Sequence, residues 1–241
     1  MVSSLHSNDS LQRIHRRLDA DRWEDIYVVG DVHGCREELE TLVERLSVGP
    51  DDLVVFVGDL VRKGPDSRGV LEFVMERPNM CTVRGNNEQK LIDDDAELPT
   101  LGPEHLEYIE SMPVIISWDD VAVVHGGIDH RKPLAEHSVD ELLNMRSLAE
   151  EGGYNRPFWF ETRRESPRVF FGHTVLSEPL ETASAVGLDT GCVHGRQLTA
   201  YDYRASRFVT LSPDTTYKDR SSDSIVTPRT QSAPTASGCS R

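Results

Sequence analysis

The chain has 241 residues, a length that allows a single domain with a sizeable hydrophobic core. It carries 41 acidic against 26 basic residues, for a net charge of -15, and only four of the basic residues are lysines. This balance excludes a basic surface for nucleic acid. An acidic, lysine-poor composition is typical of halophilic proteins, and an ordinary acidic soluble protein is the alternative interpretation.

Features of membrane and secreted proteins are absent from the sequence. The longest apolar runs, at 53–57 and 114–116, are far too short to span a bilayer. The first residues contain no apolar signal segment. The four cysteines show no CxxC pairing, which favours reduced thiols over a disulfide frame or a zinc site. We therefore expect a cytoplasmic protein with no membrane partner.

The first half of the chain predicts alternating strands and helices. Residues 1–24 are polar and predict a loosely attached lead-in to a domain at 25–212. After it, short β-branched runs alternate with segments of helical spacing. Strands are expected at 26–29, 53–57 and 81–83, and helices at 35–46, after Pro65 and from 87 onward. This alternation favours a parallel sheet.

The second half predicts a β-rich partner layer followed by a tail. A hairpin is expected at 114–124, a helix near 139–146, a strand at 169–171 and a second hairpin at 198–211. Residues 213–241 are rich in Ser, Thr, Asp and Pro and have little apolar content. This composition predicts a disordered tail.

Five short motifs follow the expected strands. They are GDVHG at 30–34, GDLV at 58–61, GNNE at 85–88, HGG at 125–127 and GH at 172–173. Any one of them alone is equally well explained by a turn or a loop histidine, so the ordered set carries the interpretation. Open α/β sheets bind their ligands at the carboxyl ends of strands, and we expect the polar side chains of the motifs to meet there.

The polar side chains of the motifs form a candidate ligand set for two metal ions. The candidates are Asp31, His33, Asp59, Asn86, His125 and His173. Mixed nitrogen and oxygen ligands suit Mn, Fe or Zn better than Ca or Mg. We expect Mn, with Fe, Zn or Ni as alternatives. Two adjacent metals are a device for hydrolysing phosphate esters.

The ordered motifs resemble the calcineurin-like metallophosphoesterases. The PPP branch, which contains serine/threonine protein phosphatases and symmetric bis(5′-nucleosyl)-tetraphosphatases, is the most similar. The resemblance extends from about residue 26 to 211, and GLDTGCV at 187–193 resembles the C-terminal signature of the tetraphosphatases. It implies an α/β fold of the four-layer α+β type. In this fold a central β-sandwich of mixed sheets is flanked by helices, and a dinuclear metal site lies at the C-terminal ends of the strands.

The resemblance also implies roles for the ligands. It places Asp31, His33 and Asp59 around one metal ion. Asp59 is shared, and Asn86, His125 and His173 complete the set around the other ion. A hydroxide that bridges the metals then attacks phosphorus in line, with no covalent phospho-enzyme.

The chain departs from the family at one functional pair. Arg62 stands where the family's second motif has Asp, and Asn87 stands where its third motif has His. In the family this His protonates the leaving group and the Asp orients it, whereas Asn cannot supply a proton. His194 is a candidate substitute acid, and a surface histidine is its alternative interpretation.

The missing acid predicts a substrate preference. A nucleotide phosphate leaving from an anhydride has a pKa of roughly 6–7 and needs little protonation, whereas the alkoxide of phosphoserine has a conjugate-acid pKa of roughly 16. We therefore expect anhydrides, aryl esters or activated diesters to be preferred over phosphoserine.

Three cations match the phosphate-binding positions of the family. They are Lys63, Arg84 and Arg146. Lys63 stands in place of an Arg, so it keeps the charge and loses the bidentate fork. A solvated helix residue is the alternative for Arg146. Arg62 either adds a phosphate contact or points to solvent.

The sequence favours a hydrolase that acts on small phosphorylated molecules such as dinucleoside polyphosphates. A serine/threonine protein phosphatase, with a phosphoprotein as partner, is the alternative on the same fold. A metal-binding module without turnover is an alternative of another class, since the acid pair is missing. The acidic charge disfavours a nuclease, and no nucleic acid partner is expected.

Overall fold

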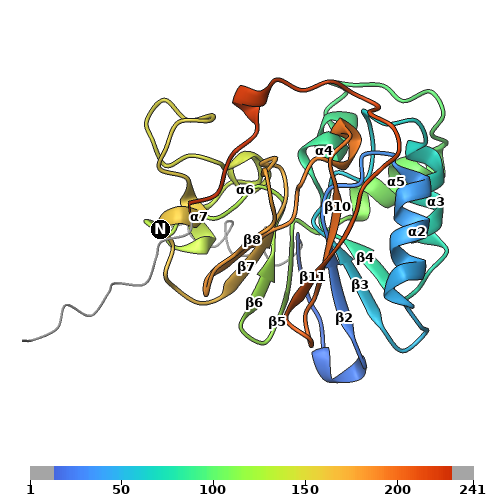
Figure 1. Cartoon of the computed structure of the whole chain (residues 1–241), viewed down its shortest axis with the longest axis horizontal. Helices are drawn as coiled ribbons and strands as arrows, with labels where there is room; N and C mark the ends of the chain where they lie inside the picture. Colours follow the sequence, from blue (N-terminus) through green and yellow to red (C-terminus); the bar gives the residue numbers. More distant parts are fainter. Residues whose placement is uncertain (1–13, 230–241) are drawn as a thin grey trace, which may run out of the picture.

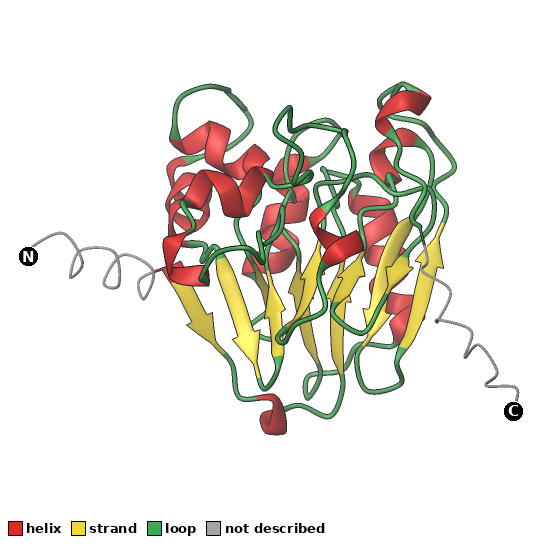
Figure 2. Ribbon diagram, turned by 90° about the vertical axis from the view of Figure 1, so that its left-hand side faces the viewer, coloured by secondary structure: helices red, strands yellow, loops and turns green. Residues whose placement is uncertain are grey.

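The computed structural model describes residues 14–229, which form two β-sheets packed face to face with helices on both outer sides (Figure 1). The strand order is β1-β5-β6-β7-β9-β8 in one sheet and β11-β10-β2-β3-β4 in the other. Figure 2 shows the strands side by side, with long loops gathered beyond one end of them. The expected central sandwich of mixed sheets is confirmed.

The five-stranded sheet contains the predicted parallel unit. Its parallel strands are β2 (Ile26–Val29), β3 (Leu53–Phe56) and β4 (Met80–Thr82). The antiparallel hairpin of β10 (Leu198–Asp202) and β11 (Arg207–Leu211) extends the sheet beside β2. Because successive side chains of a strand alternate between faces, Val28 and Val55 point into the sandwich while Tyr27 and Val54 pack under the helices.

Helices cover the outer face of this sheet. They are α2 (Arg36–Leu46), α3 (Ser67–Met75), α4 (Asn86–Ile92) and α5 (Pro103–Ser111). Leu39, Leu42 and Val70 lie at helical spacing on the buried faces of α2 and α3 and are fully buried against the sheet. This packing holds the loops that leave the strands at one end of the molecule.

The six-stranded sheet forms the other half of the sandwich. Its strands are β1 (His15–Arg17), β5 (Ile115–Trp118), β6 (Val121–Val123), β7 (Arg168–Phe171), β8 (Leu180–Glu181) and β9 (Ala185–Gly187). Two short helices, α6 (Val139–Asn144) and α7 (Trp159–Thr162), lie on its outer side. Four 3-10 turns complete the described elements: η1 (Ala20–Arg22), η2 (Leu134–Glu136), η3 (Cys192–His194) and η4 (Ser222–Ser224).

The expected lead-in is not loosely attached where the structure describes it. β1 pairs in parallel with β5 and forms an edge of the six-stranded sheet. Ala20 is buried in the core between the sheets, and Leu18 packs against that core. The expectation was wrong because strand pairing across about a hundred residues leaves no local pattern in a three-residue strand. Residues 1–13 lie outside the described part.

The expectation of a disordered tail is wrong for residues 213–229. Val226 is only 5% exposed and packs into the core outside the six-stranded sheet. Its backbone N–H donates to the carbonyl of Val175, and its carbonyl accepts from Ser177. The tail has few apolar residues, but the burial of Val226 and its two backbone hydrogen bonds attach it to the domain. Residues 230–241 lie outside the described part.

The docking of the tail predicts a measurable loss of stability in Val226→Ala. Removing two buried methyl groups leaves a small cavity, and we expect the free energy of unfolding to fall by about 1–2 kcal/mol. Thr215→Ala, at an exposed position of the same tail, is the control and should change stability by less than about 0.5 kcal/mol. Equal stabilities in chemical denaturation would contradict the docked position.

Candidate metal centre

The ends of five strands bring the predicted ligands together. Asp31 and Asp59 follow β2 and β3, and Asn86 begins the helix after β4. His125 and His173 follow β6 and β7 of the other sheet. The site therefore lies where the two sheets end side by side.

The backbone around the ligands is specialised for this arrangement. His33, Asp59 and His173 adopt positive φ angles of 51°, 54° and 62°. Such conformations cost about 1–3 kcal/mol each for residues other than glycine, and they concentrate at functional sites. A Cβ at Gly85 would collide with the carboxylate of Asp59, so glycine is required for this close approach.

Asp59 lies at the middle of the cluster. One of its oxygens, Oδ1, is 3.3 Å from Nε2 of His125, and the other, Oδ2, is 3.4 Å from Nε2 of His33. The amide oxygen of Asn86 is 3.0 Å from Nε2 of His125 and 3.1 Å from Nδ1 of His173. The two oxygens of the Asp59 carboxylate thus face two different histidines.

Asp31 completes the cluster. Its Oδ2 lies 3.7 Å from Nε2 of His33, and both of its oxygens are 3.3 Å from the backbone N–H of His173. Ligand atoms of Asp31, Asp59 and His125 all lie within 4.8 Å of one another, and all three residues are buried. The structure therefore brings all six predicted ligand residues together.

Hydrogen bonds orient two of the imidazoles. Nδ1 of His125 lies 2.8 Å from the carbonyl of Val57, and Nδ1 of His33 lies 3.1 Å from that of Val61. A carbonyl only accepts, so each Nδ1 carries a proton, and Nε2 is the ring nitrogen that faces the cluster. Outer contacts of this kind fix the tautomer of metal-binding histidines.

The electrostatics of the cluster favour a bound cation. Burial and the nearby Asp189 raise the pKa of Asp31 well above its usual value. Burial alone would lower the pKa of His125, but Asp59 outweighs it and raises this pKa to about 9. Nε2 of His173 is buried and has no hydrogen-bond partner within residues 14–229. Buried carboxylates, imidazole nitrogens and an amide oxygen fit a pair of divalent transition-metal ions.

Glu88, the last residue of the GNNE motif, has a structural role that the sequence analysis missed. Its carboxylate accepts four backbone N–H bonds, of 2.8–3.1 Å, from Gly85, Asp59, Leu60 and Val61. The side chain is fully buried, and burial together with Asp59 raises its pKa to about 7 against the effect of these donors. The only signal in the sequence was its place in the motif.

The four donors held by Glu88 predict a large effect of Glu88→Gln. An amide has one acceptor oxygen and turns its NH₂ group toward backbone donors, so buried N–H groups lose their partner. We expect a loss of about 3 kcal/mol in the free energy of unfolding. Glu107→Gln, at an exposed position of α5, is the matched control. Equal losses in the two variants would contradict the role of Glu88.

The pair that replaces the family's acid is in direct contact. Nη1 of Arg62 donates to Oδ1 of Asn87 at 2.9 Å. Nδ2 of Asn87 donates in turn to Oδ2 of Asp59 at 2.6 Å, and its backbone N–H donates to Oδ1 at 2.9 Å. Arg62 therefore does not simply point to solvent. The amide of Asn87 is held by hydrogen bonds on both sides and offers no acidic proton.

Two of the three predicted phosphate-binding cations lie beside the cluster. Nζ of Lys63 is 2.6 Å from Nε2 of His33. Nη2 of Arg146 donates to the carbonyl of His173 at 3.2 Å, and its Nε is buried without a partner within the described residues. Arg146 is thus more than a solvated helix residue.

The third cation, Arg84, makes other contacts. Its guanidinium donates to the side chain of Gln89 and to the carbonyls of Glu110 and Met112. None of these is a predicted metal ligand, so its phosphate-binding role stays a prediction. His194, the candidate substitute acid, is half-buried and bonds through Nδ1 to the carbonyl of Lys218.

Comparison with known proteins defines the class. The model of the calcineurin-like phosphoesterase family matches residues 25–209. The chain belongs to this family and is a hydrolase. No helix within residues 14–229 is long and apolar enough to cross a membrane.

Individual relatives fall into two groups by the compounds on which they act. Serine/threonine-protein phosphatase 1 of Salmonella typhimurium is 29% identical over 78% of this chain and 96% of its own length. The asymmetrical bis(5′-nucleosyl)-tetraphosphatase PrpE of Oceanobacillus iheyensis is 27% identical, with coverages of 78% and 92%. A crystal structure of a candidate diadenosine tetraphosphatase has a TM-score of 0.74 at 29% identity and covers 83% of this chain and 98% of that one.

The ligand cluster predicts that metal removal lowers thermal stability. A metal that binds only the folded state at a hundred times its dissociation constant stabilises it by about 2.7 kcal/mol, or roughly 5–10 °C in Tm for a chain of this size. We expect this rise in Tm when Mn²⁺ is returned to chelator-treated protein. Asp59→Asn should abolish most of the shift, whereas the exposed Asp119→Asn should retain it. A Tm that does not respond to metal would refute the assignment.

Proposed function

We propose that the protein is a two-metal phosphohydrolase that prefers phosphoanhydrides of small nucleotides, such as dinucleoside polyphosphates, over phosphoserine. The observation that carries the proposal is the contact between Arg62 and Asn87 beside Asp59. The ligand set is complete, while the position of the leaving-group acid holds an amide. A nucleophile bound at such a site can attack phosphorus, but no side chain at this position can donate a proton to a strongly basic leaving group.

Each side chain of the cluster has a role in the proposal. Asp31, His33 and Asp59 would hold one cation, and Asp59 would also take part in the second site. Asn86, His125 and His173 complete that second site. A bound metal pair supplies a nucleophile at neutral pH and a Lewis-acid clamp on phosphoryl oxygens.

The cations of the chain act on the substrate itself. Lys63 and Arg146 lie beside the cluster, where their charges neutralise phosphoryl oxygens as negative charge develops. Asn87 holds the Asp59 carboxylate in place through its amide N–H. The nucleotide phosphate of an anhydride then departs as an anion without a proton from the protein.

The donor set and the composition support the remaining details. Mixed imidazole and carboxylate ligands suit Mn²⁺, with Fe, Zn and Ni as the alternatives. The reduced cysteines support a cytoplasmic setting, and the acidic, lysine-poor surface supports a salt-rich one.

A protein phosphatase is the second candidate, favoured by the similarity to the Salmonella serine/threonine phosphatase. This candidate requires a proton donor other than Asn87, with His194 near the strand ends as the named alternative. A metal-binding module without turnover is disfavoured because the ligand set is complete.

The proposal is tested by comparing turnover of diadenosine tetraphosphate and a phosphoserine peptide with Mn²⁺ at high salt. We expect the anhydride to be strongly preferred and both activities to disappear in Asp59→Asn. Preference for the peptide would replace the proposal by the protein-phosphatase function. Absence of any turnover would favour the non-catalytic module.

Restoring the family's acid pair predicts a gain of activity. In the double variant Arg62→Asp, Asn87→His, an imidazolium oriented by a carboxylate can protonate an alkoxide. We expect kcat/KM for the phosphoserine peptide to rise by about 10²-fold, because general acid catalysis typically contributes this much. Asn87→His alone, beside the positive charge of Arg62, should gain less. A double variant no better than the wild type would contradict the account of the missing acid.

A further inference from the structure

The tail crosses the metal end of the molecule as a strap, defined as residues 213–226. It leaves β11 and runs across the top of Figure 1, from the side of α2 to the side of α6. At its start, the hydroxyl of Tyr217 donates to Glu38 at 2.9 Å, and the backbone N–H groups of Tyr217 and Lys218 donate to the carbonyl of Val193. At its end, Val226 is buried against the other sheet. The strap is thus held on both halves of the sandwich.

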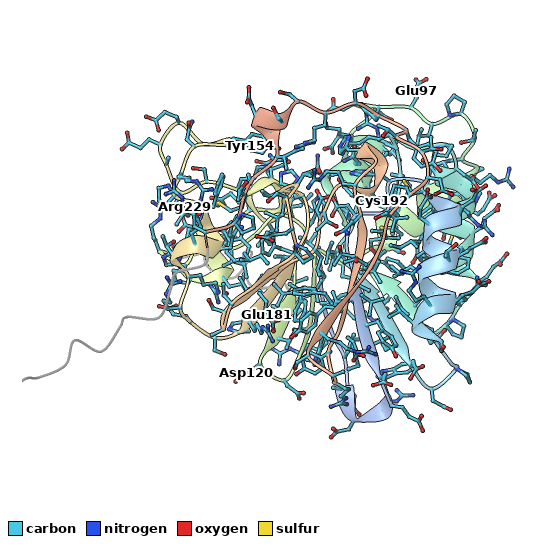
Figure 3. The ribbon with its side chains drawn as sticks, in the orientation of Figure 1. Glu97, Asp120, Tyr154, Glu181, Cys192 and Arg229 are labelled. Carbon is cyan, nitrogen blue, oxygen red and sulfur yellow. The ribbon has the colours of Figure 1, made fainter. Side chains whose placement is uncertain are left out.

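Between these anchors the strap presents one arginine, Arg220. Its guanidinium donates to the hydroxyl of Tyr154 and, through Nε, to the carbonyl of Ser224 at 3.1 Å. Its Nη1 lies 3.4 Å from Nε2 of His194. Figure 3 labels Tyr154 directly below the strap. The orientation of Arg220 is therefore fixed by contacts on both of its sides.

A second arginine shares the same tyrosine. The guanidinium carbon of Arg146 lies 5.1 Å from the ring centroid of Tyr154, and that of Arg220 lies 5.9 Å from it. Arg146 also bonds to the carbonyl of His173, a predicted metal ligand. The two arginines thus lie on one tyrosine ring, and Arg146 also contacts the candidate metal centre.

Neither guanidinium is neutralised by the part of the chain that the structure describes. Among residues 14–229, no carboxylate forms an ion pair with Arg146 or Arg220. Two half-buried cations beside one tyrosine ring repel each other, and an anion bound between them would relieve this repulsion.

We propose that Arg220 binds a phosphate of a polyphosphate substrate that lies beyond the phosphate attacked at the metal centre, next to the one that Arg146 contacts. This inference rests on the proposed phosphoanhydride function and deepens it, because the strap then selects chains of two or more phosphates over single ones. The planar guanidinium fork matches phosphate oxygens in a bidentate geometry that a lysine does not provide. Arg146 contacts the candidate metal centre, and Arg220 shares the ring of Tyr154 with it.

The test compares binding of one and two phosphonate groups to the Mn-loaded, full-length protein. Methylphosphonate carries one group and methylenediphosphonate carries two, and neither can be hydrolysed. Calorimetry gives the ratio of their dissociation constants, after subtraction of the heat of Mn²⁺ chelation in protein-free buffer. We expect methylenediphosphonate to bind more tightly and Arg220→Gln to reduce the ratio about tenfold, the value of one charge-assisted hydrogen bond.

Two further variants isolate the effect of Arg220. Arg220→Lys keeps the charge without the fork, and the ratio should lie between those of the wild type and Arg220→Gln. Arg204→Gln is the matched control, because Arg204 bonds to the carbonyl of Ala20 outside the metal centre, and the ratio should stay unchanged. Thermal unfolding of each variant verifies that it is folded, and Arg220→Lys provides the comparison if Arg220→Gln is not.

The outcomes separate this inference from the proposed function. A ratio that Arg220→Gln leaves unchanged, or equal weakening of both ligands, overturns the role of Arg220. If the ratio depends on Arg220 but diadenosine tetraphosphate is not turned over, the substrate proposal fails while the two-phosphate site stands.

Discussion

The site depends on one buried carboxylate, that of Asp59. Its two oxygens face His33 on one side and His125 on the other, while Asn87 donates two hydrogen bonds to it. The backbone N–H of Asp59 is in turn held by Glu88. Through these contacts the end of β3 is joined to the start of α4 and to the opposite sheet.

The packing of the two sheets explains how the Asp59 carboxylate is shielded from solvent. Side chains from the ends of both sheets surround it: the imidazoles of His33 and His125 face its oxygens, and Asn87 donates two hydrogen bonds that water would otherwise supply. Three positive φ angles, at His33, Asp59 and His173, store strain in the same loops. Two bound cations would compensate the buried negative charge, so metal binding and folding stability are linked in this domain.

Much of the fold and of the site follows from local sequence signals, and the remainder depends on contacts between distant segments. The meeting of the six candidate ligands at one place is predictable because each follows an apolar strand in a short glycine-containing motif. The contact between Arg62 and Asn87 was not predicted, because the sequence left Arg62 either to a phosphate contact or to solvent. The pairing of β1 with β5 and the docking of Val226 are not predictable either, since their partners lie far away in the chain. The role of Glu88 also escapes sequence reasoning because its partners are backbone N–H groups.

The central claim is that the protein lacks a proton donor for the leaving group. The most direct measurement is kcat/KM, with Mn²⁺, for a series of aryl phosphates whose leaving-group pKa ranges from about 7 to about 10. Without a donor, negative charge accumulates on the leaving oxygen, and the account predicts a steep fall of kcat/KM as the leaving-group pKa rises. The double variant Arg62→Asp, Asn87→His should flatten this dependence. A dependence that is already flat in the wild-type protein would show that another group supplies the proton, and it would contradict the account.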